Sequence, residues 1–230
     1  MNRIGLVGGM SYVSTVFYYE KINQTVNKLR GGQHSADVVI ISPDFQIICE
    51  AFNNNDWETI QKVLSKAIHE LEDMGCNLIG VCCNTVHHVF NEIKSTQRSK
   101  IIHILEPTIQ AIKRKSIKNI GIIGTKFTLS SCGYCDYVTQ NGLSLIQPAA
   151  PLIEKLNQVI FDEMCHGFLS EEGKKIMLLA RDSIMEKGGE GIILGCTELG
   201  LFLDDGKFCE NIFNSSLLHA EKIALGYCCA

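Results

Sequence analysis

The sequence predicts an α/β protein built from two similar lobes, each a parallel sheet covered by helices. The 230-residue chain alternates short, continuously apolar runs with longer amphipathic segments, a pattern typical of buried parallel strands joined by helices. Two motifs near the start of the chain also return in its second half. A repeat of this period is the size of a domain, so we expect two lobes of one design.

Strands are predicted where apolar, often β-branched residues run without alternation. A strand covered on both faces has this pattern, because neither of its faces meets water. The predicted strands are residues 3–7, 37–42, 77–82, 101–105, 119–124, 143–147, 191–195 and 211–213.

Helices are predicted between these strands. Residues 56–73 carry an apolar stripe at helical spacing, with Asp56 as N-cap and Gly75 beyond the end. Residues 171–187 repeat this design and are followed by Gly188. The stripes consist of Ile60, Val63, Leu64, Ala67, Ile68 and Leu71 in the first helix and of Ile176, Leu179, Ala180 and Ile184 in the second.

The internal repeat sets the domain organisation. "RIGLVGGMSYVST" opens the chain and "NIGIIGTKFTLSS" begins at residue 119, while "MGCNLIGVCCNT" (74–85) is echoed by "KGGEGIILGCTE" (187–198). We predict an N-terminal lobe at 1–110 and a C-terminal lobe at 111–210. The last segment, 211–230, contains a helix that we expect to return to the first lobe.

The composition argues against nucleic-acid and membrane partners. The formal net charge is −4, and Lys and Arg are scattered without interleaved aromatic residues. No apolar run approaches the roughly 18 residues that span a bilayer, and the first residues lack the apolar region of a signal peptide. We therefore expect a soluble cytoplasmic protein that binds neither nucleic acid nor membrane.

The eleven cysteines are expected to be free thiols, most of them simply buried. Cys83 and Cys196 differ from the rest, because each follows a predicted strand at the matching position of the repeat. Functional groups of open α/β sheets gather at the carboxyl ends of strands. If the lobes face each other, these two thiols meet across a cleft.

Two facing thiols are suited to general acid–base catalysis at carbon. A thiolate can remove a proton from one face of a carbon acid, and a thiol can deliver a proton to the other face. For an amino acid the result is inversion at Cα. Asn84 and Thr85 beside Cys83, and Thr197 beside Cys196, are donors that could hold the substrate carboxylate.

The motifs in this order resemble the aspartate/glutamate racemase family of cofactor-independent amino-acid racemases. The resemblance runs along the whole chain and rests on "GLVGGMS", "CNT", "GTKFT" and "GCTE", with "GGQHSA" and "NQVIFDEMCHG" between them. It implies two flavodoxin-like lobes related by a pseudo-twofold axis, an active site in the cleft between them, no pyridoxal phosphate or metal, and a homodimer. It also implies that Cys83 and Cys196 are the proton donor and acceptor, acting on aspartate, glutamate or a related small polar amino acid.

One departure concerns specificity. The aspartate-specific branch of the family carries an Arg after the second strand and a Lys in the second lobe, and the corresponding positions here are near Ile48 and Cys165. Neither residue can bind an anion by charge, so the sequence is closer to the broad-specificity branch. Some members have Thr at the first catalytic position, and the two cysteines here therefore favour a true two-base reaction.

Further site residues come from the strand ends of both lobes. Met10 and Ser11 follow a glycine pair that lacks the G-x-G-x-x-G pattern of a dinucleotide loop. Thr125 and Thr128 are their second-lobe counterparts, and these four residues are predicted to contact the substrate. Glu198 is predicted to bind the substrate ammonium, to adjust the pKa of a neighbouring thiol, or to interact favourably with the dipole of the following helix as a first-turn residue.

Several alternatives stay open at this point. Cys82 is expected to pack in the core, since it lies one residue from Cys83. His87 or His88 could act as a base, and Cys132 with Cys135 forms a C-x-x-C pattern typical of redox proteins. A metal site would want a second C-x-x-C, which is absent. The rival functions are another thiol-assisted isomerase, a decarboxylase, and a non-catalytic binding or redox protein.

Overall fold

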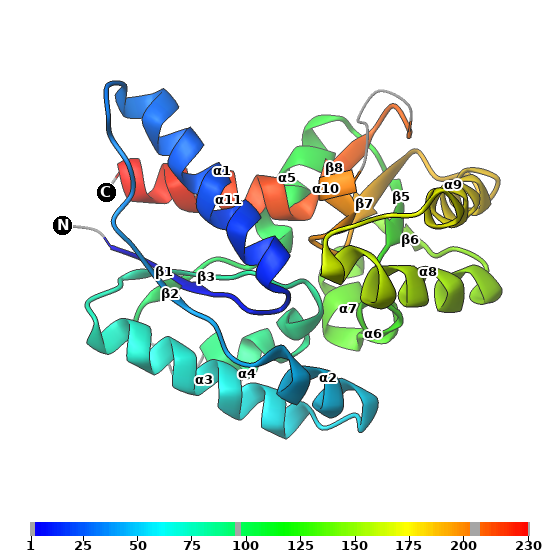
Figure 1. The fold of residues 1–230 in the computed structure, drawn as a ribbon. Coiled ribbons are helices and arrows are strands. Elements are labelled where there is room, and N and C mark those ends of the chain that lie inside the picture. The colour runs from blue at the N-terminus through cyan, green and yellow to red at the C-terminus, as the bar shows by residue number, and fades with distance from the viewer. Residues whose placement is uncertain (1–2, 95–97, 203–207, 230) are drawn as a thin grey trace.

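The computed structural model describes residues 3–94, 98–202 and 208–229, and within them the chain forms two four-stranded parallel sheets. The strand orders are β2-β1-β3-β4 and β6-β5-β7-β8, so the second sheet repeats the first (Figure 1). The strands are β1 (Ile4–Val7), β2 (Val38–Ile41), β3 (Leu78–Val81), β4 (Lys100–Ile101), β5 (Asn119–Ile123), β6 (Ser144–Ile146), β7 (Gly191–Leu194) and β8 (Ile212–Asn214). The predicted α/β class with two parallel sheets is confirmed.

Helices cover both faces of the first sheet. On one face, α1 (Tyr12–Arg30) and α11 (Ser215–Cys228) lie side by side over Ile4 and Leu6. On the other face, α3 (Trp57–Asp73) packs over Val7 and Ile79. The shorter elements on that side are α2 (Phe45–Asn53), the 3-10 helix η1 (Thr85–Val89) and α4 (Phe90–Lys94).

The second sheet is covered in the same way. Helices α5 (Leu105–Arg114) and α7 (Cys132–Gln140) pack on one face, and α8 (Ala150–Asp162) and α9 (Glu171–Met185) pack on the other. The shorter elements are α6 (Lys126–Ser130), the 3-10 helix η2 (Met164–His166) and α10 (Leu199–Phe202). The predicted boundary between residues 110 and 111 falls inside α5, whose buried side chains pack with β5 and β7.

The predicted helix signals operate as expected. The Asp56 side chain accepts a hydrogen bond from the Thr59 amide at the start of α3, which confirms the predicted N-cap. Gly75, with φ +82°, and Gly188, with φ +86°, follow the two helices in the left-handed region, where a glycine has no steric penalty. The two helix-to-strand turns that lead to Cys83 and Cys196 are therefore built alike.

One predicted strand is much shorter than expected. Residues 101–105 were predicted as a strand, but β4 covers only Lys100–Ile101 and α5 already begins at Leu105. The ring of His103 accepts a hydrogen bond from the Leu105 amide, and the Glu106 amide bonds to the His103 carbonyl. These bonds turn the chain into α5. The run Ile101–Leu105 therefore contains the end of β4 and the start of α5 in succession.

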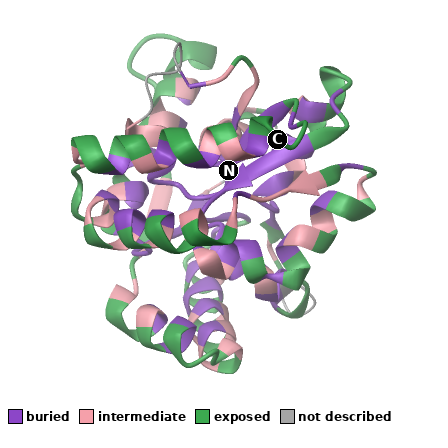
Figure 2. Ribbon diagram, turned by 90° about the vertical axis from the view of Figure 1, so that its right-hand side faces the viewer, coloured by how far each residue is buried: buried purple, intermediate pink, exposed green. Residues whose placement is uncertain are grey.

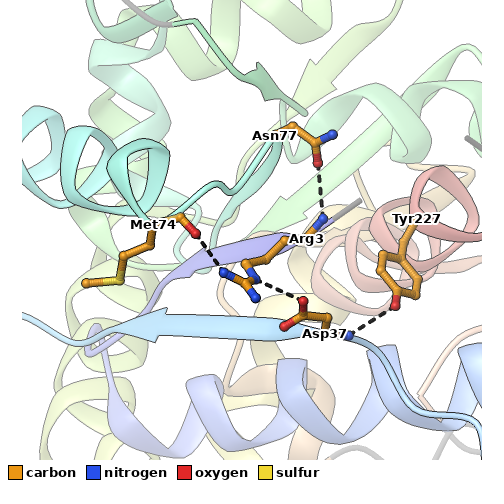
Figure 3. A network of polar contacts seen from close by, with 5 residues as sticks. All are labelled: Arg3, Asp37, Met74, Asn77 and Tyr227. Atoms are coloured by element: carbon orange, nitrogen blue, oxygen red, sulfur yellow. Dashed lines mark hydrogen bonds and ion pairs between the residues drawn. The ribbon is translucent and has the colours of Figure 1, made fainter. Parts of the chain in front are cut away.

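A polar network ties the far end of the first sheet together (Figure 3). The Arg3 guanidinium pairs with Asp37 at 2.9 Å and donates to the Met74 carbonyl, while the Tyr227 hydroxyl accepts from the Asp37 amide. Because Arg3 and Asp37 are both well exposed, this ion pair adds at most about 1 kcal/mol to stability. The hydrogen bond from the Asp37 amide to Tyr227 attaches the end of α11 to the start of β2.

Burial follows the layered design. Figure 2 shows buried residues on strands and on the inner faces of the helices, with exposed residues on the outer faces, and the buried strands are the central ones, β1, β3, β5 and β7. None of the helices in the described part of the chain is both long and apolar enough to cross a membrane.

Candidate active site

Cys83 and Cys196 line the same cavity, at the carboxyl ends of the central strands of the two sheets. Cys83 lies two residues beyond β3 and Cys196 two residues beyond β7, and both side chains are buried. The lining residues are Met10, Phe45, Phe52, Cys83, Asn84, Thr85, Thr125, Ile160, Phe161, Cys165, Cys196, Thr197 and Glu198. The cavity measures about 20 Å³, which holds roughly one water molecule.

The predicted site residues come together at this cavity, although two of them lie behind its wall. Met10, Asn84, Thr85, Thr125, Thr197 and Glu198 line it together with the two thiols. Ser11 instead donates its hydroxyl to Glu198 at 2.8 Å, and Thr128 bonds to Thr85 at 2.8 Å. Ser11 and Thr128 therefore position lining residues.

The surroundings of Cys83 raise its pKa overall, although several hydrogen bonds act the other way. Burial raises the pKa of Cys83 to about 12, and hydrogen bonds from the Val86 amide and from the amide and hydroxyl of Thr85 act in the opposite direction. The His87 ring does not serve as a base for this thiol. Its Nδ1–H donates to the Cys83 carbonyl at 2.8 Å, and its Nε2 accepts from the Ile104 amide, so His87 fixes the backbone of Cys83.

The surroundings of Cys196 favour its protonated thiol. Burial raises the pKa of Cys196 well above its ordinary value, and the carboxylate of Glu198 raises it further. The Cys196 thiol donates to Oε2 of Glu198 at 3.0 Å, while Oε1 of the same carboxylate accepts from the Ser11 hydroxyl. One carboxylate oxygen of Glu198 thus contacts the Cys196 thiol, and the other contacts Ser11 of the first lobe.

Asn84 presents an uncommitted donor at the cavity. Its Oδ1 accepts from the Tyr134 hydroxyl at 2.9 Å, and the Ser215 hydroxyl lies 3.0 Å from the same oxygen and 2.6 Å from the Leu194 carbonyl. Its Nδ2 is buried and has no hydrogen-bond partner within the described residues. A buried donor left without a partner is costly, so this amide suits an anionic ligand group. Sequence reasoning found Asn84 but missed Tyr134 and Ser215, which fix its amide.

Three threonine hydroxyls join the two lobes beside the thiols. Thr85 of the first lobe lies 3.2 Å from Thr125 and 2.8 Å from Thr128, and these two hydroxyls are 3.1 Å apart. Thr125 also accepts from the Thr128 amide as the N-cap of α6. The cluster holds the Cys83 side of the cavity against the start of the second lobe.

The remaining wall of the cavity is apolar, and of its residues only Cys165 was singled out from the sequence, as lying near the position of a Lys in the aspartate-specific branch. The wall consists of Phe45 and Phe52 from α2, Ile160 and Phe161 from α8, and Cys165 from η2. The rings of Phe45 and Phe161 stack across the lobes at 6.4 Å. Phe45, Phe161 and Cys165 also border an outer cavity of about 440 Å³. They therefore separate the thiols from this outer space, and at the sequence level they are indistinguishable from core residues.

The remaining cysteine and histidine alternatives fall elsewhere. Cys82 packs with Ile4 and Leu6 on the opposite face of the first sheet from Cys83, which confirms its predicted core role. Cys132 and Cys135 are free thiols in the first turns of α7 and do not line the cavity. His88 bonds to the Ser131 hydroxyl. Within the described residues, no group of three or more His, Cys, Asp or Glu could hold a metal ion.

A larger cavity lies away from the thiols. It measures about 850 Å³ and opens between α1, α5, β8 and the start of α11. None of the predicted site residues lines this larger cavity, so the smaller cavity beside the thiols is the candidate active site.

Comparisons with known proteins identify the family of this chain. The profile of the Asp/Glu/hydantoin racemase family matches residues 7–209. A glutamate racemase of Aquifex aeolicus is 28% identical over 200 residues, covering 85% of this chain and 75% of that protein. A broad-specificity amino-acid racemase of Bacillus subtilis is 27% identical over 146 residues, covering 62% of this chain and 63% of that protein.

The likeness extends to solved structures. A protein of Yersinia pestis, crystallised as a candidate Asp/Glu racemase, superposes with a TM-score of 0.89 at 34% identity, over 99% of this chain and 100% of that one. This agreement covers both lobes and the strand ends that carry the two thiols. The chain belongs to the Asp/Glu/hydantoin racemase family and is an isomerase of the amino-acid racemase type.

Proposed function

We propose that this isomerase inverts the Cα configuration of an amino acid by two-base proton transfer between Cys83 and Cys196, without a cofactor. The observation that carries the proposal is the cavity itself. Two buried thiols, one from each lobe and at matching positions of the repeat, line it together. A carbon acid between them has one sulfur near each face, the arrangement that two-base inversion requires.

The polar lining residues give each end of an amino acid a partner. The carboxylate of Glu198 is the anion that an α-ammonium group needs, and it already accepts hydrogen bonds from Cys196 and Ser11. The unpaired Nδ2 of Asn84 is the donor for the α-carboxylate, together with the hydroxyls of Thr85, Thr125 and Thr197. Both ends of the substrate backbone are thereby fixed, which orients Cα between the sulfurs.

In one direction of the reaction Cys83 is the base and Cys196 is the acid. The Cys83 thiolate takes the Cα proton, the electron pair stays on the substrate as a carbanion, and Cys196 gives its proton to the opposite face. Cys83 ends as a thiol and Cys196 as a thiolate, so the reverse reaction starts from the product state. The donors at the α-carboxylate stabilise the charge that spreads onto it in the transition state.

Substrate binding itself promotes the thiolate. The Glu198 carboxylate raises the pKa of both thiols in the empty site, and an ammonium group beside it offsets that effect. The cavity has room for roughly one water. An amino acid must therefore displace the wall formed by Phe45, Phe161 and Cys165 to reach the sulfurs.

The substrates proposed from the family are aspartate, glutamate or a related small polar amino acid, and the proposed form of the protein is a cytoplasmic homodimer. The relatives are named as glutamate and broad-specificity racemases, so the activity assay covers both enantiomers of many amino acids. Light scattering after gel filtration measures the assembly. A monomer at assay concentration contradicts the homodimer and leaves the chemistry untouched.

The test is solvent deuterium incorporation at Cα during turnover. Each enantiomer is incubated in D₂O, exchange is followed by NMR, and the enantiomeric ratio is read by chiral chromatography. We expect exchange and inversion with at least one amino acid. If no enantiomer in the panel exchanges its α-hydrogen, the racemase proposal is wrong. Release of carbon dioxide with exchange would instead identify a decarboxylase.

A further inference from the structure

The cavity lining divides by chemistry and by origin. Its hydrogen-bonding and ionisable side chains, from Cys83 to Thr85, at Thr125 and from Cys196 to Glu198, follow the strand ends β3, β5 and β7. The side chains contributed by the helices α2, α8 and η2 are Phe45, Phe52, Ile160, Phe161 and Cys165. A bound amino acid therefore has its backbone atoms on the strand-end side and its side chain toward the helices.

The helical side of the cavity offers nothing to an anion. Its four hydrocarbon side chains have no polar hydrogen, and burial raises the pKa of the Cys165 thiol and so keeps it neutral. Among the described residues, no Lys or Arg lines either the inner cavity or the outer cavity beyond Phe45 and Phe161. On the helical side of the inner cavity a side-chain carboxylate would lose its water and gain no charged partner. The hydrogen-bonding side chains of the outer cavity, among them Tyr12, Ser42, Gln46 and His166, belong to the space beyond Phe45 and Phe161.

The charges already in the site point the same way. The α-ammonium and α-carboxylate of an amino acid cancel each other, and Glu198 together with one thiolate leaves the occupied site with excess negative charge. A second carboxylate on the substrate would add to this excess in a buried volume, where like charges repel strongly. A neutral hydrocarbon side chain meets no such penalty and contacts the two stacked rings, Phe45 and Phe161.

We infer that the substrates of this site are neutral amino acids with apolar side chains, which the wall of Phe45, Phe52, Ile160, Phe161 and Cys165 selects. The inference rests on the proposed racemase function and, from the lining of this cavity, replaces the acidic and small polar substrates proposed from the family with apolar ones. The wall is a specificity element, since it contacts the substrate side chain, while the thiols act at Cα whatever that side chain is.

The first experiment compares kcat/KM for Cα exchange across matched pairs. Methionine and leucine are set against glutamate and aspartate, which have similar lengths and differ in charge. We expect at least a hundredfold preference for the apolar member of each pair. Equal or better exchange with aspartate or glutamate overturns the inference and leaves the racemase proposal standing. Absence of exchange with every amino acid overturns the racemase proposal itself.

The second experiment places a cation in the wall. The variant Cys165→Lys adds an ammonium at a half-buried position that borders both cavities, and Cys165→Met is its neutral control. We expect Cys165→Lys to raise glutamate or aspartate exchange relative to methionine by at least tenfold, and Cys165→Met to keep the original order. If the lysine variant folds, as judged by circular dichroism, and leaves the ratio unchanged, the wall does not set specificity.

Discussion

The two halves of the active site occupy matching positions of a repeated fold and yet differ in electrostatics. Cys83-Asn84-Thr85 follows β3, and Cys196-Thr197-Glu198 follows β7. The third residue is a hydroxyl donor in the first lobe and a carboxylate in the second. Thr85 therefore lowers the pKa of its cysteine, while Glu198 raises the pKa of Cys196.

Two cysteines at equivalent positions of a repeated fold can therefore differ in how easily they lose a proton. The backbone turn sets where each sulfur lies. Burial raises the pKa of both thiols most, and the side chain two residues later adds a contribution of opposite sign in the two lobes. A two-base reaction needs one thiolate and one thiol at the start. Two cysteines with identical surroundings would have equal pKa values, which does not favour this pair of protonation states. The following predictions break this asymmetry or exaggerate it.

The largest effect is expected from removing either sulfur. Cys83→Ser and Cys196→Ser should each lower racemisation by about 10²- to 10⁴-fold, because a hydroxyl is a far weaker acid and base partner than a thiol. Each variant should retain some Cα exchange from the one enantiomer that faces the remaining thiol. Exchange in D₂O, measured separately for both enantiomers, checks this. Wild-type racemisation in either variant contradicts the two-thiol site.

Replacing the Glu198 carboxylate should weaken substrate binding and shift the pH dependence of the reaction to lower pH. In Glu198→Gln the negative charge near both thiols is lost, so their pKa values fall and the acid limb of kcat/KM shifts to lower pH. KM should rise by about tenfold to a hundredfold, because the substrate ammonium loses its charged partner.

Steady-state kinetics across pH 6 to 10 measures both effects of Glu198→Gln. Ser11→Ala is the matched control, since it removes a hydrogen bond to Glu198 and leaves the charge in place. An unchanged acid limb in Glu198→Gln, or an equal shift in Ser11→Ala, contradicts the assigned role of the charge.

A smaller and opposite shift is expected in the first half of the site. Thr85→Val keeps the shape of the side chain and removes a donor that lowers the pKa of Cys83, so the acid limb should move to higher pH. The rate at neutral pH should fall several-fold, for a hydrogen bond of about 1 kcal/mol. Thr125 and Thr128 still bond to each other at 3.1 Å, which limits the loss of stability. A shift to lower pH would contradict the comparison.

The last effect concerns stability, not catalysis, and belongs to the first lobe. His87 lies four residues after Cys83, and the matching residue after Cys196 is Gly200, where a side chain would collide with Asn214. Burial lowers the pKa of His87 to about 4 and that of His219, which bonds to Tyr18, to about 3. The folded protein thus disfavours protonated rings that the unfolded chain accepts near pH 6.5.

The stabilising contribution of these rings is complete above about pH 6.5 and is lost as the pH falls toward the folded pKa values. The slope is up to about 1.4 kcal/mol per pH unit for each ring. Urea unfolding at pH 7.5 and pH 5 measures it, and His87→Gln should show a shallower dependence than the wild type. An equal dependence in the two proteins would show that His87 does not contribute.

Much of the fold and part of the site could be predicted from the sequence. Continuous apolar runs located the strands, and the repeated glycine-to-cysteine spacing placed Cys83 and Cys196 at matching strand ends, because these signals are local. The split of Ile101–Leu105 between a strand and a helix start depends on hydrogen bonds around His103. The apolar wall could not be found, because Phe45 and Phe161 come together only through tertiary packing.

Helix α11 has a consequence for how the protein is made. Its residues Ala220, Ile223 and Ala224 pack with Ile4 and Leu6 of β1, so the core of the first lobe contains side chains from residues 215–228. Helix α1 covers part of this face, but the part under α11 stays uncovered during synthesis until the residues after the second lobe have left the ribosome. Contacts of such long sequence separation slow folding and leave an apolar surface exposed meanwhile. Assembly of the cavity is thus tied to the synthesis of α11, since Ser215, the first residue of this helix, also contacts Asn84.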